Sequence, residues 1–253
     1  MPVSAEANST AHTHIAHMAT YGKLYMIPCP ISDCPVEAVL PPRNRDIVER
    51  LGYFIVENIR SARRFLGRGG LGLPVGELKF AECNEHTSPE EFQALVAPLL
   101  EGHDVGFISE AGVPGVADPG AEVAAICHRA GIRVIPLVGP SSILLALMAS
   151  GQNGQSFAFN GYIPVKQPQR NTVLKSLEKR AAGGQSQLFI ETPYRNAGIM
   201  DDMLAVLSQD TRVTVAADIT GEGEFIRTLT IREWRAQSRP DINKRPAIFI
   251  IGR

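Results

Sequence analysis

The chain has 253 residues, of which 44% are apolar and 20% charged, and its formal net charge is −1. Such a length and composition are typical of a soluble globular protein with one large or two modest domains, and the balanced charge gives no global attraction to nucleic acid or to a membrane surface. No apolar run is long enough to span a bilayer, and the four cysteines, at no metal-ligand spacing, favour a reducing, cytoplasmic setting without disulfides or bound metal.

The first 22 residues show no apolar periodicity and are rich in Ser, Thr, Ala and His. No apolar segment follows a basic start, so they do not resemble a signal peptide. We expect residues 1–22 to form a disordered tail. Weak metal binding by His12, His14 and His17 is the alternative.

Strands and helices alternate from Lys23 to the middle of the chain, which predicts a mainly parallel sheet. The expected strands are residues 24–30, 53–57, 79–83, 105–109 and 133–138. The expected helices are residues 43–51, 59–66, 88–101, 119–129 and 143–150. Ser88 and Glu91 have the spacing of a capping box at the start of one of these helices.

After a hinge-like segment at residues 151–155 the pattern restarts. The expected strands are residues 157–163, 187–191, 213–218, 224–231 and 247–252, and the helices are residues 167–182, 194–208 and a short one around Trp234. A short Thr-Gly-Glu-Gly turn joins two neighbouring strands, so this sheet should be mixed. We therefore expect an α/β protein with two α/β domains, residues 23–140 and 141–253.

Several apolar strands end in an acid, and ligands of open α/β sheets collect beyond the carboxyl ends of the strands. These acids are Glu57, Glu82, Glu110, Glu191 and Asp218. They could hold a cation or act as a base, although some of them should only cap the helices that follow.

Two turns rich in glycine and proline follow strands. In the first turn, residues 110–120, the glycines permit close approach of a ligand, and Asp118 can cap a helix that begins at Pro119. A plain βα turn without a ligand is equally consistent with this pattern. In the other turn Ser141 can cap the next helix, whose free amides suit the carboxylate of an amino-acid-like ligand.

Arginines gather on the helix at residues 59–66. Between Arg43 and Arg68 there are seven arginines against three acids. Contact with a phosphate backbone is the functional interpretation, and a solvated helix face is the alternative. The adjoining Gly67–Gly72 run has the spelling of a dinucleotide fingerprint, but it follows a helix and precedes a strand, so we interpret it as a flexible loop.

Four motifs in order carry a family resemblance: SEAGVPGVADPG (109–120), GPSSILLALMASG (139–151), FNGYIP (159–164) and ETPYR (191–195). Together they resemble the tetrapyrrole-methylase-fold, class III, methyltransferases that use S-adenosylmethionine (SAM). The sequence is most similar to the branch that methylates a ribose 2′-hydroxyl in small-subunit ribosomal RNA. The resemblance implies SAM in a cleft between two α/β domains, an RNA substrate and a homodimer.

The same resemblance implies roles for individual residues. Those expected at the cofactor are Pro30, Gly112, Val113, Val116, Ser141, Ser142, Tyr162 and Ile163. Glu57 is the first candidate for the base, with Asn58 and Arg60 orienting the substrate, and Glu110 and Glu191 come next. Substrate-side motifs depart from the ribosomal branch, so methylation of a tetrapyrrole or other small molecule, and an inactive SAM-binding regulatory module, stay open as alternatives.

Overall fold

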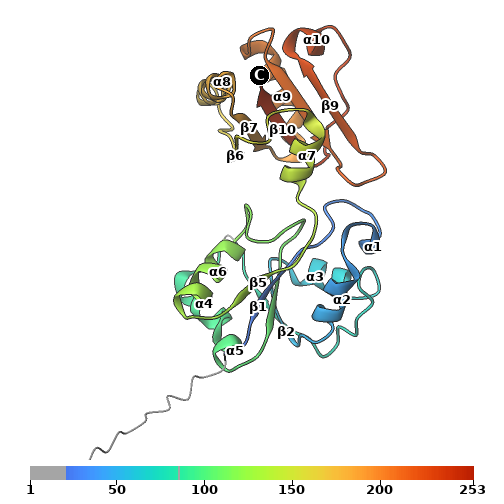
Figure 1. Ribbon diagram of the computed structural model, residues 1–253, viewed down its shortest axis with the longest axis vertical. Coiled ribbons are helices and arrows are strands. Elements are labelled where there is room, and N and C mark those ends of the chain that lie inside the picture. The colour runs from blue at the N-terminus through green and yellow to red at the C-terminus, as the bar shows by residue number, and fades with distance from the viewer. Residues whose placement is uncertain (1–20, 85) are drawn as a thin grey trace, which may run out of the picture.

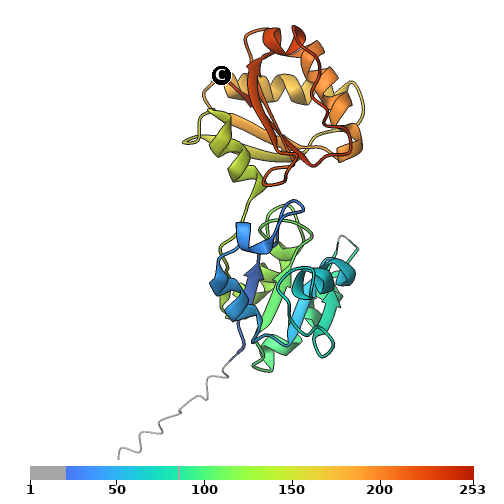
Figure 2. The same cartoon turned by 90° about the vertical axis from the view of Figure 1, so that its right-hand side faces the viewer.

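The computed structural model describes residues 21–84 and 86–253. The chain forms two lobes stacked along the long axis of the molecule, each built around its own sheet (Figures 1 and 2). Nearly all of the expected N-terminal tail, with its three histidines, lies outside the described residues.

The first lobe holds a five-stranded sheet in the order β3-β2-β4-β1-β5, and every pair in it is parallel. Its strands are β1 (Leu24–Ile27), β2 (Tyr53–Val56), β3 (Lys79–Glu82), β4 (Val105–Ile108) and β5 (Val134–Pro136). The central strand β4 is buried throughout, as expected for a continuous apolar run covered on both faces.

Helices cover both faces of this sheet (Figure 1). They are α1 (Val36–Val39), α2 (Pro42–Val48), α3 (Ile59–Leu66), α4 (Pro89–Leu95), α5 (Ala97–Leu100) and α6 (Gly120–Arg129). The apolar core accordingly divides into two clusters, one under α2 and α3 and the other under α4, α5 and α6.

The second lobe holds a mixed sheet in the order β6-β7-β10-β8-β9, in which only β6 and β7 are parallel. Its strands are β6 (Phe157–Tyr162), β7 (Ser186–Ile190), β8 (Arg212–Ala217), β9 (Phe225–Thr230) and β10 (Ala247–Gly252). Its helices are α7 (Ser142–Ser150), α8 (Gln169–Ala182), η1 (Pro193–Arg195), α9 (Asn196–Val206) and α10 (Ile231–Arg235). The expected two-sheet α/β fold is confirmed.

Several local expectations were wrong. The helix expected over residues 88–101 is broken at Val96 into α4 and α5, because Pro98 lacks an amide and its ring would clash with the carbonyl four residues earlier. The strand expected over residues 133–138 shortens to β5, a half-exposed edge strand that contains Pro136. Helix α6 begins at Gly120 rather than Pro119.

No helix in the described part of the chain is long and apolar enough to cross a membrane. All four cysteines are free. Within residues 21–84 and 86–253 there is no group of three or more His, Cys, Asp or Glu side chains placed to hold a metal ion.

Candidate active site between the two lobes

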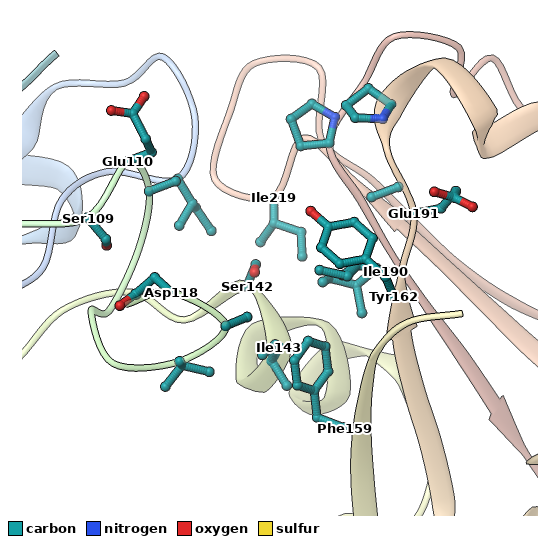
Figure 3. A pocket seen from close by; sticks show the side chains of 18 of the residues that line it. Ser109, Glu110, Asp118, Ser142, Ile143, Phe159, Tyr162, Ile190, Glu191 and Ile219 are labelled. Atoms are coloured by element: carbon teal, nitrogen blue, oxygen red, sulfur yellow. The ribbon is translucent and has the colours of Figure 1, made fainter. Parts of the chain in front are cut away.

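A cavity of about 350 Å³ lies where the carboxyl ends of the parallel strands face the second lobe. Figure 3 shows Ser109, Glu110 and Asp118 on one wall, and Phe159, Tyr162 and Ile190 on the opposite wall. Residues Ser142 and Ile143 at the start of α7 lie between the two walls. Both lobes therefore contribute to one site.

The loop after β4 forms the polar wall and is held by main-chain hydrogen bonds. Gly112 exchanges two of them with Cys29, N–H to carbonyl at 3.0 and 3.1 Å, and so ties this loop to the segment after β1. Its φ of +72° and that of Gly115, +82°, lie in the left-handed region that favours glycine. The expected need for glycine in this loop thus has a conformational cause.

Asp118 organises the same loop rather than serving as the N-cap residue of α6. Its carboxylate accepts the Gly115 amide with both oxygens, at 2.8 and 2.9 Å, and the Gly120 amide at 2.7 Å. The N-cap position itself belongs to Pro119, which makes no side-chain cap. One carboxylate thus bridges two amides across the turn and stabilises the shape of the loop.

We expect Asp118→Ala to lower the free energy of unfolding by about 2 kcal/mol, since it leaves the Gly115 and Gly120 amides without their charged acceptor. Asp118→Asn, which keeps one acceptor oxygen, should lose about half as much. Urea unfolding of the three proteins measures this. A transition of Asp118→Ala at the wild-type urea concentration would show that this carboxylate does not hold the loop.

Glu57 and Glu110 meet at the ends of neighbouring strands. The Glu57 Oε2 atom accepts the Glu110 main-chain amide at 2.6 Å, and the exposed Glu110 carboxylate accepts the Ser61 hydroxyl at 3.2 Å. Burial raises the pKa of Glu57, and the negative charges of Asp118 and Glu110 add to this, against the opposing effect of the Glu110 amide. A carboxyl with a raised pKa is a stronger proton acceptor, once ionised, than an ordinary glutamate.

The two residues expected to assist Glu57 lie on α3. Asn58 is the N-cap of this helix, and its side chain accepts the Ser61 amide at 3.1 Å. Arg60 follows on the exposed side of α3 and is not among the residues that line the interlobe cavity. Asn58 therefore fixes the start of α3, and Arg60 is placed outside the cavity.

Glu191 lines the cavity from the second lobe but differs electrostatically from Glu57. Burial acts to raise its pKa, yet the Arg195 guanidinium at 2.6 Å and the Thr192 amide at 2.6 Å outweigh burial, and the pKa is lowered. It is thus a weaker proton acceptor than Glu57. The other strand-end acids are engaged elsewhere: Glu82 accepts the Ile59 amide, and Asp218 pairs with Arg245 at 2.5 Å.

The residues expected at the cofactor fall into two groups. Val116, Ser142 and Tyr162 line the cavity. The others lie in the segments around it. Gly112 and Val113 are in the loop after β4, Ser141 caps α7 by accepting the Leu144 amide at 3.4 Å, and Pro30 lines a second hollow beside α3. Ile163 is 4% exposed and packs in the core of the second lobe.

Sequence reasoning missed most of the apolar wall. Phe159 and Ile190 lie near the ends of parallel strands, so the strand-end argument used for the acids could have found them. Ala247 and Ile248 begin β10, which runs antiparallel to its neighbours. Because β10 is antiparallel to its neighbours, its first residues lie at the same sheet edge as the last residues of those neighbours. No local sequence pattern indicates that a strand start will lie at this edge.

The lining fits a ligand with a planar apolar part and a cationic part. Phe159, Ile190 and Ile248 offer an apolar surface, while Glu57 and Asp118 are carboxylates on the facing wall. Two buried oxygens of lining residues, Ser109 Oγ and Glu191 Oε2, have no hydrogen-bond partner in the described structure. Both atoms are enclosed by the protein, so they do not themselves form part of the cavity surface.

Two α/β lobes with a ligand-sized cavity between them define a class of enzyme fold, and a crystal structure of the methyltransferase CobJ has this fold. The superposition has a TM-score of 0.62 at 16% identity and covers 91% of this chain and 94% of CobJ. At that identity the likeness shows the fold alone. The chain belongs to the tetrapyrrole (corrin/porphyrin) methylases, because residues 56–234 match the model of that family. It is therefore a methyltransferase, as the four motifs predicted.

Two relatives that share one name match most of the chain. The chain is 29% identical over 230 residues to the ribosomal RNA small subunit methyltransferase I of Escherichia coli O157:H7, covering 91% of this chain and 77% of the relative. It is 34% identical over 212 residues to the protein of the same name from Mesorhizobium japonicum, covering 83% of this chain and 67% of the relative. These sequence similarities confirm the predicted resemblance to the ribosomal branch.

Proposed function

We propose that this chain transfers a methyl group from SAM to a ribose hydroxyl of small-subunit ribosomal RNA. Similarity to relatives named as ribosomal RNA small subunit methyltransferases supports the choice of substrate. The observation on which the proposal depends is the interlobe cavity, which joins an apolar wall and a carboxyl with a raised pKa in one site.

SAM, when bound, supplies an electrophilic methyl group on a positively charged sulfur. In our proposal Tyr162 and its apolar neighbours hold the adenine. Val116 lines the cavity, and we assign to the same cofactor site the main-chain groups of Gly112 and Val113, which lie in the same loop. The free amides of the first turn of α7, at Ser141 and Ser142, suit a carboxylate. The two remaining expected residues, Pro30 and Ile163, contribute by holding these segments in place.

The chain's own task is to orient the acceptor hydroxyl, exclude water and take a proton. Positioning along the line of methyl transfer and exclusion of water require no covalent residue. In our proposal the Glu57 carboxylate accepts the hydroxyl proton, Asn58 holds α3 beside it, and Arg60 contacts the RNA. Glu110 is the second candidate for the base, since it lies next to Glu57.

The rate of methyl transfer should rise with pH through the raised pKa of Glu57 and then level off, because only the ionised carboxyl accepts a proton. The rise should therefore lie above 4.5, the ordinary glutamate value. The effect on folding stability has the opposite sign, because a raised pKa means that folding favours the protonated form of Glu57. The protonated carboxyl therefore contributes fully to the free energy of unfolding below pH 4.5, and this contribution is lost as the pH rises through the raised pKa. Initial rates and urea unfolding across pH measure both effects, and Glu57→Gln should abolish the stability effect.

Incubation of the protein with tritiated SAM and small ribosomal subunits tests the substrate. Label in the RNA supports the proposal, and binding of SAM by calorimetry without label in any RNA contradicts it. The net charge of −1 favours a second candidate, a tetrapyrrole or other small acceptor, for which label would appear in the small molecule. SAM binding without transfer to either acceptor would instead fit a regulatory module.

We further propose that the protein acts in the cytoplasm as a homodimer, with domains at residues 23–140 and 141–253. The four free cysteines support a reducing compartment. The one sheet in each lobe supports the division into domains. Analytical ultracentrifugation of the full chain distinguishes a monomer from a dimer.

A further inference from the structure

A second hollow, of about 440 Å³, adjoins the interlobe cavity in the first lobe. We call it the α3 groove: one wall is the segment of residues 29–34, and the other is α3 with Gly69. Ser109 and Glu110 line both the α3 groove and the interlobe cavity. An acceptor in the groove would thus reach the cofactor site at Glu110.

Exposed arginines lie along α3 and at its end. Arg60, Arg64 and Arg68 are all exposed, α3 itself contains no acid, and Arg64 lines the groove. None of these three guanidinium groups forms a salt bridge with a carboxylate of the described residues, whereas Arg45 in the preceding helix pairs with Glu49 at 2.8 Å. Their charges are available to an external anion.

The Gly67–Gly72 loop keeps this end of α3 compact. The Gly70 and Gly72 amides both donate to the Gly67 carbonyl, at 3.0 and 2.8 Å. A Cβ on Gly69 would lie 3.2 Å from Arg64 Cγ, so the missing side chain lets the arginine stem lie against the loop. Gly69 therefore leaves room for the stem of Arg64 beside the groove.

We propose that Arg60, Arg64 and Arg68 bind phosphates of an RNA strand that lies along the α3 groove, with a ribose at its inner end beside Glu110. This inference rests on the proposed function. The groove also carries two acids, Asp33 and Glu110. Carboxylates repel phosphates but accept hydrogen bonds from neutral hydroxyls, so phosphates belong on the arginine side and the ribose at Glu110. Local charge on α3 thus binds RNA although the whole chain has a net charge of −1.

The test compares the full-length wild type with the double variant Arg64→Gln/Arg68→Gln. Binding of fluorescein-labelled, deproteinised small-subunit ribosomal RNA is followed by anisotropy at several salt concentrations. We expect roughly tenfold weaker binding, and a salt slope of log K smaller by about 1.4 for a single strand, because two phosphate contacts are lost. SAM affinity by calorimetry should equal that of the wild type.

The matched control is Arg129→Gln/Arg133→Gln, which removes the same charge from two exposed arginines. Arg129 ends α6, which covers the other face of the sheet from α3 (Figure 1), and Arg133 directly precedes the edge strand β5. This control should bind RNA like the wild type. Unchanged affinity and salt slope in the α3 variant, or an equal loss in the control, would overturn the inference. Methylation of RNA by the wild type is measured in parallel. If the wild type methylates the RNA but the α3 variant binds RNA as the wild type does, RNA binding along the α3 groove is refuted and the proposed function is still supported.

Discussion

Replacing Glu57 by Gln is expected to slow methyl transfer by about 10²–10⁴-fold, the usual contribution of a general base, while SAM affinity stays close to that of the wild type. Glutamine cannot take the hydroxyl proton, but its side-chain oxygen can still accept the Glu110 amide that the glutamate now accepts at 2.6 Å. The geometry of the strand ends is therefore preserved. Single-turnover transfer of tritium from labelled SAM measures the rate, and calorimetry measures the affinity.

Variants of two other glutamates that line the same cavity test whether the loss of rate is specific to Glu57. Glu191→Gln alters a buried carboxylate whose pKa is already lowered by Arg195, so it should reduce stability more than the chemical step. Glu110→Gln tests the neighbouring candidate. Wild-type turnover in Glu57→Gln together with its loss in Glu110→Gln would transfer the role of base to Glu110.

Gly112→Ala should weaken SAM binding by more than tenfold, which corresponds to about 1.4 kcal/mol. Gly112 has a φ of +72°, which costs an alanine about 1–2 kcal/mol. The new Cβ would lie 3.0 Å from Ile31 Cγ2 and 3.2 Å from the Pro140 carbonyl oxygen. Since the added methyl presses on the segments after β1 and before α7 at once, it should displace both from the cofactor site. Calorimetric titration with SAM measures the effect.

Gly131→Ala is the matched control for this glycine. Its φ is also +72°, but an added Cβ has no atom within 4 Å. Backbone strain should cost both variants about 1–2 kcal/mol of folding stability, and only Gly112→Ala should lose SAM affinity. Equal SAM affinities in the two variants would contradict a cofactor role for the loop.

Local pattern was sufficient for most of the elements. The helix expected at residues 59–66 is α3 without change, and the capping box of Ser88 and Glu91 forms as expected. The short helix around Trp234 also exists, and Thr230 and Glu233 form a capping box at its start. These features depend on residues near one another in the chain, which is why the sequence alone predicts them.

Motif resemblance predicted Val116, Ser142 and Tyr162 at the cavity, whereas the strand-end argument works only where neighbouring strands are parallel. Acids that end parallel strands must share one edge of the sheet, so Glu57 and Glu110 were expected together and do meet. Ala247 lies at the corresponding edge of the other lobe because β10 runs the opposite way, and nothing in its surroundings in the sequence indicates this. Ile163 carries the right motif but is directed into the core by its place after β6.

By itself the sequence determined the class of fold, the two sheets and the family, because apolar periodicity, turn residues and ordered motifs are local properties of the chain. Only the tertiary structure decided which side chains share the interlobe cavity, and that the arginines of α3 lie beside a groove leading to Glu110. Those relations depend on strand direction and on how the two lobes face each other. Contacts between residues far apart in the chain set both of these, and no single segment specifies them.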